Sequence, residues 1–220
     1  MAPVTPPRPT SVAIAGDVPV EVAWSVDPDS QRALVYLHGH CGDPTAFRGW
    51  ADAATSHGTL MSLRGDLECP RRPGRRKWSF DLARIDRRIR AALQAVSDHR
   101  GRSDGGLRAE DIALIGYSQG ALRVEFLAHA FPQRYRRVVS IAVAAAPSPY
   151  RFREAERVLF MAGGWDVRRH IRDGYDELRH LQRGQGRGET RYLELPRARH
   201  GSYGPEGPAV MAEGLDWLFE

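Results

Sequence analysis

A serine in a glycine-rich segment is the strongest candidate for chemistry in this sequence. Ser118 stands in Gly116-Tyr117-Ser118-Gln119-Gly120, a G-x-S-x-G pattern. The apolar run 112–115 precedes it, and a helical pattern over 119–131 follows it. This order predicts a sharp strand-to-helix turn that exposes the hydroxyl, while the flanking glycines let backbone segments approach closely. We therefore expect Ser118 to act as a nucleophile.

A serine hydroxyl is too weakly acidic to attack a carbonyl unaided, so it needs a general base. In chains with this motif the acid and then the histidine follow the serine. We expect His200 to be the base, because it lies in a loop between the strand-like segment 192–195 and the last helical pattern. The alternatives are weaker, since they fall in helical segments: His129, His170 and His180.

The base in turn needs a carboxylate that orients it. Asp166 follows the apolar run 158–161, which predicts a position at the carboxyl end of a buried strand. Asp173 and Asp176 compete, but both lie in a helical pattern and are expected on the surface. A helix N-cap is the structural alternative for Asp166.

Acyl transfer also needs backbone amides that point at the developing oxyanion. The apolar run 34–37 ends in His38-Gly39-His40-Cys41-Gly42. We expect the two amide donors to be those of Gln119 and His40, with the Cys41 amide as a neighbouring possibility. The side chain of His38 is expected to anchor this loop rather than to act in catalysis.

Segments that must position these residues alternate between strand and helix patterns. Continuous apolar runs predict strands buried on both faces of a parallel sheet, and they occur at 34–37, 112–115, 138–143 and 158–161. Residues 20–26 alternate as a half-buried strand would, and 59–63 and 192–195 are weaker candidates. The alternation with helices predicts an α/β fold with helices on both faces of a mostly parallel sheet.

Helical patterns fill the intervals between these strands. An apolar stripe after a predicted N-cap at Ser79 comprises Leu82, Ile85, Ile89, Leu93 and Val96. Arginines off this stripe are expected to face water: Arg84, Arg87, Arg88 and Arg90. Pro208 is expected to open the last helix. The segment 184–188, GQGRG, is expected to be a loop without the context of a dinucleotide site.

Composition limits the domain organisation and the partners. The 220 residues suit one domain over 11–220, preceded by a Pro-rich disordered tail over 1–10. The net charge is +5, but the arginines are interspersed with acidic residues, so we expect no nucleic-acid partner. No apolar stretch is long enough for a membrane span. The sequence leaves the oligomeric state open.

Two cysteines, Cys41 and Cys69, do not form a disulfide-rich framework or a zinc-binding CxxC pair. One bridge between them is possible but not implied. Because no signal peptide is visible, we expect a cytoplasmic protein. The alternative is an exported protein whose signal peptide is absent from this sequence, and a Cys41–Cys69 bridge would favour it.

Taken together, these motifs resemble those of the α/β-hydrolase superfamily. The segment GYSQGA and the LHG sequence before the oxyanion loop are most similar to its compact carboxylesterase and acyl-protein thioesterase branch. The resemblance extends over residues 20–219. It implies a Ser118-His200-Asp166 triad, oxyanion amides at His40 and Gln119, and no metal or organic cofactor. It also implies hydrolysis of a carboxylic ester or thioester through an acyl-enzyme.

Substrate selectivity is expected to depend on two loops. The segment 147–157 is too short for a lid, which predicts an open site with Tyr150 and Phe152 at its rim. Trp78 and Phe80 could line an acyl pocket. Basic residues in the same loop could attract an acidic substrate: Arg71, Arg72, Arg75, Arg76 and Lys77. An equally supported alternative is a solvated basic loop that Trp78 anchors to the core.

Other functions remain open at the level of sequence. An acyltransferase or a serine peptidase would use the same triad, and a non-catalytic binding protein could use the same fold. A metal-dependent hydrolase is disfavoured, because His38-x-His40 lacks the surrounding ligands that such an enzyme needs.

Overall fold

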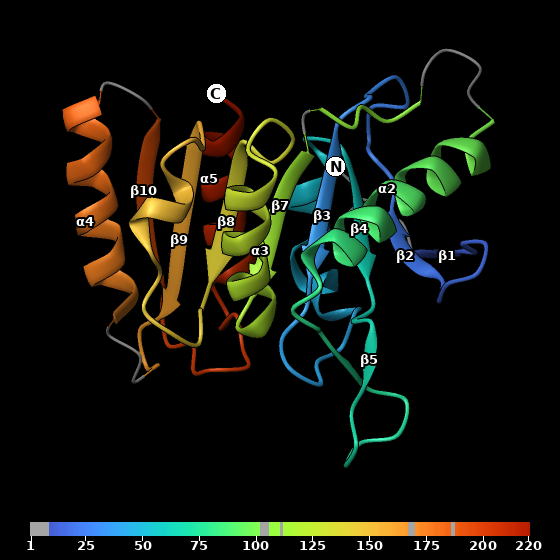
Figure 1. The fold of residues 1–220 in the computed structure, drawn as a ribbon, viewed down its shortest axis with the longest axis horizontal. Helices are drawn as coiled ribbons and strands as arrows, with labels where there is room; N and C mark the ends of the chain where they lie inside the picture. Colours follow the sequence, from blue (N-terminus) through green and yellow to red (C-terminus); the bar gives the residue numbers. More distant parts are fainter. Residues whose placement is uncertain (1–8, 102–105, 111, 167–169, 186–187) are drawn as a thin grey trace, which may run out of the picture.

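The fold is built on one eight-stranded sheet, seen in a computed structural model that describes residues 9–101, 106–110, 112–166, 170–185 and 188–220 (Figure 1). In spatial order the strands are β1 (Thr10–Val12), β2 (Val20–Ala23), β4 (Thr59–Leu63), β3 (Ala33–Leu37), β7 (Ile112–Tyr117), β8 (Arg137–Ile141), β9 (Arg157–Gly163) and β10 (Glu189–Leu195). Strands β4, β3 and β7 to β10 are parallel, whereas β1 and β2 pair antiparallel. The mostly parallel α/β sheet expected from the sequence is confirmed.

The parallel strands are central because their sequences can be buried on both faces. Every residue of β3 (ALVYL) and of β7 (IALIGY) is buried. Strand β2 differs from the prediction of a half-buried strand. It is also fully buried, because Val22 packs in the hydrophobic cluster on one face and Ala23 in the cluster on the other. Glu21 within it is paired with Arg64 at 3.6 Å.

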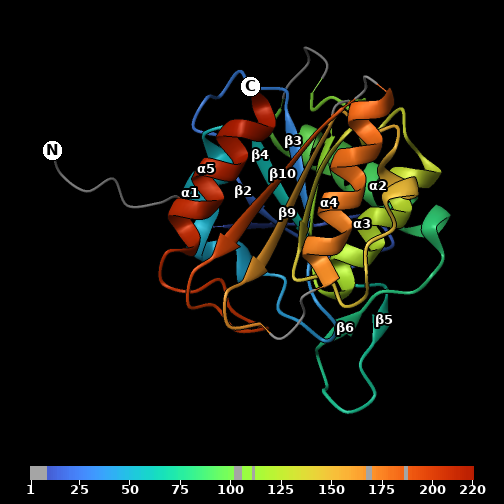
Figure 2. The ribbon, with the colours of Figure 1, turned by 90° about the vertical axis from the view of Figure 1, so that its left-hand side faces the viewer.

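Helices cover both faces of the sheet. They are η1 (Ala46–Trp50), α1 (Ala51–Thr55), α2 (Leu82–His99), α3 (Gln119–Ala130), η2 (Pro149–Phe152), α4 (His170–Gln185) and α5 (Gly207–Phe219). Helices α2, α3 and α4 lie on one face, and α1 and α5 lie on the other (Figures 1 and 2). A separate hydrophobic cluster lies between the sheet and the helices on each face. The first cluster includes Val124 of α3, and the second includes Leu215 of α5.

The start of α2 corrects two sequence predictions. Asp81, not Ser79, is the N-cap, because its carboxylate accepts a hydrogen bond from the Arg84 amide at 2.9 Å. Ser79 instead accepts one from the Asp81 amide at 3.1 Å. Arg88 does not face water. It is 8% exposed and pairs with Asp17, which the loop between β1 and β2 brings over this helix.

A short hairpin extends from the carboxyl-terminal end of the sheet. It consists of β5 (Leu67–Glu68) and β6 (Arg76–Lys77), and it projects beyond the sheet in both views (Figures 1 and 2). A disulfide joins Cys69 of this hairpin to Cys41, so the bridge that the sequence left open is formed. It ties the hairpin to the loop that follows β3.

Some predicted boundaries differ at the ends of elements. Thr10 begins β1 and pairs with Val22, so the predicted tail over 1–10 extends too far, and residues 1–8 of it lie outside the described part. Gly184 and Gln185 of the predicted loop belong to the end of α4, whereas residues 186 and 187 are not described.

Two further features concern the exterior of the described residues. None of their helices is both long enough and apolar enough to cross a membrane. Between β8 and β9 the chain forms only the single turn η2, so this connection contains no lid. A lidless fold was expected from the length of this segment.

Candidate active site

Ser118 lies at the turn between β7 and α3, where the backbone is strained. Its φ of 53° and ψ of −110° are unusual for a residue other than glycine. The turn is tight enough to require its glycines. A Cβ at Gly120 would overlap the carbonyl oxygen of Leu37, and one at Gly116 would lie 2.6 Å from the Ala121 amide nitrogen. The sequence therefore forms the strand-turn-helix that presents Ser118.

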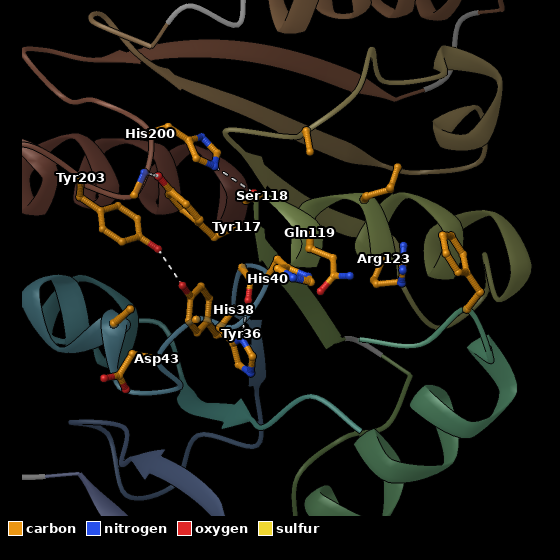
Figure 3. A pocket seen from close by; sticks show the side chains of 17 residues that line it. Tyr36, His38, His40, Asp43, Tyr117, Ser118, Gln119, Arg123, His200 and Tyr203 are labelled. Atoms are coloured by element: carbon orange, nitrogen blue, oxygen red, sulfur yellow. Dashed lines mark hydrogen bonds between the residues drawn. The ribbon is translucent and has the colours of Figure 1, made fainter. Parts of the chain in front are cut away.

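A hydrogen-bonded chain connects three side chains from three separate loops. The Nε2 atom of His200 lies 3.0 Å from the Ser118 hydroxyl (Figure 3). Its Nδ1 atom lies 2.9 Å from the carboxylate of Asp166. The Asp166 side chain is only 1% exposed, whereas that of His200 is 32% exposed. With a proton on Nδ1, His200 donates to Asp166 and accepts from Ser118, which is the arrangement needed for proton abstraction.

The competing candidates lie elsewhere in the fold. His129 is exposed on α3 and contacts Tyr150, with the two rings tilted, while His180 and Asp176 are exposed on α4. None of these three lines the pocket at Ser118. The side chains of His170 and Asp173 lie outside the described part of the structure.

Aromatic side chains that the sequence analysis did not select hold the His200 loop. The Gly201 amide donates to the Tyr117 hydroxyl at 2.6 Å, and the Tyr203 hydroxyl donates to that of Tyr36 at 3.1 Å (Figure 3). Burial raises the pKa of both Tyr36 and Tyr203, so these hydroxyls stay neutral. Tyr117 stands beside Ser118 in the G-x-S-x-G segment, but nothing in its sequence position indicates this partner 84 residues away.

The buried side chain of His38 holds the loop that follows β3. This side chain is buried, donates from Nδ1 to the Gly39 carbonyl at 2.7 Å, and accepts at Nε2 from the Gly65 amide at 3.0 Å. The Trp78 indole donates to the His38 carbonyl at 2.7 Å. These contacts match the expected anchoring role of His38, and they place His40 beside Ser118 in the wall of the pocket (Figure 3).

The burial of His38 predicts a pH-dependent stability. Burial lowers the pKa of His38 from 6.5 to about 4, so between these values the unfolded chain binds the proton more readily. This contribution to stability is complete above pH 6.5 and is lost as the pH falls towards 4, by up to about 3 kcal/mol. Denaturant unfolding of the wild type and of His38→Asn should show it. A pH slope in this range that is equal in the two proteins would contradict the assignment.

The pocket around Ser118 has a volume of about 630 Å³. Phe80 lines it and is 72% exposed, whereas Trp78 is 2% exposed beneath the loop. Of the two roles considered for these aromatic residues, Trp78 has the anchoring role, because it is buried beneath the loop. Phe80 faces the cavity, as a residue that lines an acyl pocket would. The prediction that Tyr150 and Phe152 lie at the rim of the site was wrong. Phe152 is buried against Phe160 in the core, and Tyr150 does not line the pocket.

One group of side chains among the described residues has the composition of a metal site. It comprises His40, Cys41 and Cys69. Both sulfur atoms are joined in the disulfide, so neither is available as a thiolate ligand in this state. His38 does not join His40 as a ligand pair, because its Nε2 atom accepts the Gly65 amide.

Comparisons with known proteins show which solved structures have a similar fold. No protein-family model and no curated protein sequence matches the chain. Among solved structures, a predicted CIB-like hydrolase from Thermoplasma acidophilum is 15% identical, with a TM-score of 0.66 over 96% of this chain and 97% of that chain. A dienelactone hydrolase from Anabaena variabilis is 18% identical, with a TM-score of 0.63 over 97% and 98% of the two chains. A carboxylesterase from Mesorhizobium loti is 19% identical, with a TM-score of 0.61 over 95% and 99%. The chain therefore has the α/β-hydrolase fold.

Proposed function

We propose that the protein is a serine hydrolase that cleaves a carboxylic ester or thioester. Ser118 is the nucleophile, His200 the general base and Asp166 the acid that orients it. The observation that carries the proposal is the position of His200, which is hydrogen-bonded to both Ser118 and Asp166. The hydrolases and esterases that share the fold are consistent with this class of reaction.

In the first half of the reaction, the Ser118 oxygen attacks the acyl carbonyl carbon while His200 takes the hydroxyl proton. Asp166 stabilises the resulting imidazolium across the 2.9 Å hydrogen bond. His200 then gives this proton to the departing alcohol or thiol. The carbon–oxygen or carbon–sulfur bond breaks, and the acyl group remains as an ester of Ser118.

Two backbone amides would stabilise the tetrahedral oxyanion. Gln119 begins α3, so its amide has no carbonyl partner within the helix and lies at the positive end of the helix dipole. His40 lies beside Ser118 in the wall of the pocket, in the loop that His38 and Trp78 hold. Their side chains are not required for this role, because the donors belong to the backbone.

Hydrolysis is completed by water. A water oxygen attacks the acyl carbon while His200 takes a proton from this water. The same proton passes to Ser118 when the acyl–serine bond breaks. An acyltransferase would replace water with another acceptor, and a peptidase would release an amine. No contact in the described pocket favours either, so water and an ester are the simplest assignment.

The direct test is covalent labelling with a fluorophosphonate probe followed by peptide mass spectrometry. We expect one adduct on Ser118 in the folded protein and none after heat denaturation, because only an assembled triad activates the serine. No adduct on folded protein would contradict the proposal and favour a non-catalytic binding protein. An acyl-chain series of chromogenic esters would then define the acyl specificity.

The disulfide bears on the compartment. Disulfides persist in oxidising environments and are rare in the reducing cytosol. We infer that the Cys41–Cys69 bridge favours the exported alternative over the cytoplasmic expectation. Alkylation of free thiols in protein taken directly from the producing cells would test this, since a reduced pair would support the cytoplasmic location.

A further inference from the structure

A second concavity adjoins the catalytic pocket on the other side of His40. Its volume is about 470 Å³, and its walls are His40, Cys41, Pro70, Arg71 and Arg72. His40 also lines the pocket around Ser118, so the two hollows share a wall. A substrate that extends past His40 would therefore meet the hairpin.

The arginines of this hairpin fall into two groups. Arg75 pairs with Asp43 at 3.0 Å, while Arg76 donates to the Gly65 carbonyl at 2.6 Å and lies 3.7 Å from Glu68. These two hold the hairpin in place. Arg71 and Arg72 are exposed, and within the described part of the chain neither side chain has a carboxylate partner or a hydrogen bond. Their positive charge is therefore available to a ligand.

The turn that carries this pair is constrained at both ends. Cys69 is bonded to Cys41, and its amide donates to the Arg75 carbonyl at 3.0 Å. The Arg72 amide donates to the Cys69 carbonyl at 3.1 Å. Arg71 and Arg72 thus lie two and three residues after Cys69, which is bonded to the loop that contains His40. A ligand bound there does not have to order the loop, which favours binding.

The catalytic pocket also contains a positive charge, beside Phe80. Arg123 lines it, is 1% exposed, and leaves its Nη1 atom without a hydrogen-bond partner among the described residues. The acidic residue in the lining of this pocket, Asp43, is paired with Arg75. Three other carboxylates lie outside this lining: Asp166 is hydrogen-bonded to His200, Asp66 acts on Arg123, and Glu68 lies 3.7 Å from Arg76. Among the described residues that line the two hollows, the one carboxylate, Asp43, is therefore already paired with a guanidinium.

We propose that this concavity, the Arg71–Arg72 subsite, binds an oxyanion group of the substrate, either a carboxylate or a phosphate. Guanidinium groups recognise both through paired, charge-assisted hydrogen bonds. The proposal rests on the proposed function and adds to it a substrate class, esters that carry a negative charge beyond the scissile carbonyl.

Matched esters test this class. Phenyl acetate is the neutral reference for a charge on the leaving group, and 3-acetoxybenzoate and 3-acetoxyphenyl phosphate carry the two oxyanions. 4-Nitrophenyl pentanoate and mono(4-nitrophenyl) glutarate form a second pair, with the charge on the acyl group. The measured quantity is the ratio of kcat/KM for each anionic ester to that for its neutral partner.

The diagnostic variant is Arg71→Gln/Arg72→Gln, and its matched control is Arg87→Gln/Arg179→Gln. Both remove two positive charges, but Arg87 and Arg179 are exposed on helices α2 and α4 and line neither hollow. We expect the first variant to lower the ratio about tenfold for at least one anionic ester, and the control to change it less than about twofold. Which oxyanion responds identifies the preferred group. Equal ratios in the wild type and both variants, for every pair, would overturn the proposal.

A binding measurement separates this proposal from the proposed reaction. NMR titration of Ser118→Ala with 3-acetoxybenzoate or 3-acetoxyphenyl phosphate needs no turnover. We expect the dissociation constant of the preferred ligand to rise about tenfold when Arg71→Gln/Arg72→Gln is added. Such a loss would support the subsite even if Ser118 failed to react with the fluorophosphonate. An unchanged dissociation constant for both ligands would overturn it even in an active esterase.

Discussion

Replacement of Ser118 by alanine should abolish ester turnover, with kcat lowered about 10⁵-fold to 10⁶-fold. The reason is that the variant lacks the oxygen that forms the acyl-enzyme, whereas His200 and Asp166 can keep their hydrogen bond. Some acceleration should remain from substrate binding and the backbone amides. Steady-state kinetics with a chromogenic ester would measure the loss, and the fluorophosphonate adduct should disappear with it.

The matched control for this change is Ser140→Ala. Ser140 is a fully buried serine in the adjacent strand β8, and its hydroxyl has no hydrogen-bond partner among the described residues. Its removal should leave kcat nearly unchanged and should not destabilise the fold, because no satisfied polar group is lost. If Ser118→Ala retains wild-type turnover while folded, the assignment of Ser118 is wrong.

Asp166→Asn should have the second largest effect, a decrease of about 10⁴-fold in kcat. An asparagine at this position is similar in shape, but it is neutral and can present its amide group to the Nδ1 atom of His200. The imidazole would then carry its proton on Nε2 and could not accept the proton of Ser118. The imidazolium formed during the reaction would also lose its opposite charge.

KM should change much less than kcat in this variant, because Asp166 does not line the pocket. Asp176→Asn on α4 is the matched control, since it makes the same chemical change at an exposed site. Thermal unfolding of both variants would show that they are folded. A decrease of less than about tenfold in folded Asp166→Asn would move the acid to another residue.

The parts of the fold that followed from the sequence are those with local patterns. The continuous apolar runs identified β3, β7, β8 and β9, because strands buried on both faces have no polar alternation. Asp166 and His200 could be placed together because each follows a strand, and parallel strands end at one edge of the sheet. Their hydrogen bonds to one another and to Ser118 required the structure.

The errors came from contacts between distant segments. Arg88 lies on the polar side of its helix in sequence, but Asp17, 71 residues earlier, covers it. Phe152 was expected at the rim of the site, because its short segment follows the strand β8. It packs instead against Phe160 in the core. The five basic residues over 71–77 are alike in sequence. Contacts with Asp43, Glu68 and the Gly65 carbonyl separate Arg75 and Arg76 from Arg71 and Arg72.

The disulfide between the hairpin and the loop after β3 affects how the concentration of active protein has to be measured. Cys41 follows His40 directly, so the disulfide fixes one side of the loop that holds a proposed oxyanion donor. A preparation made in reducing cells would contain molecules with and without this bond. Both would have nearly the same mass and absorbance, although they could differ in catalytic competence. Active-site titration, rather than protein concentration, is therefore the appropriate denominator for every rate constant of this protein.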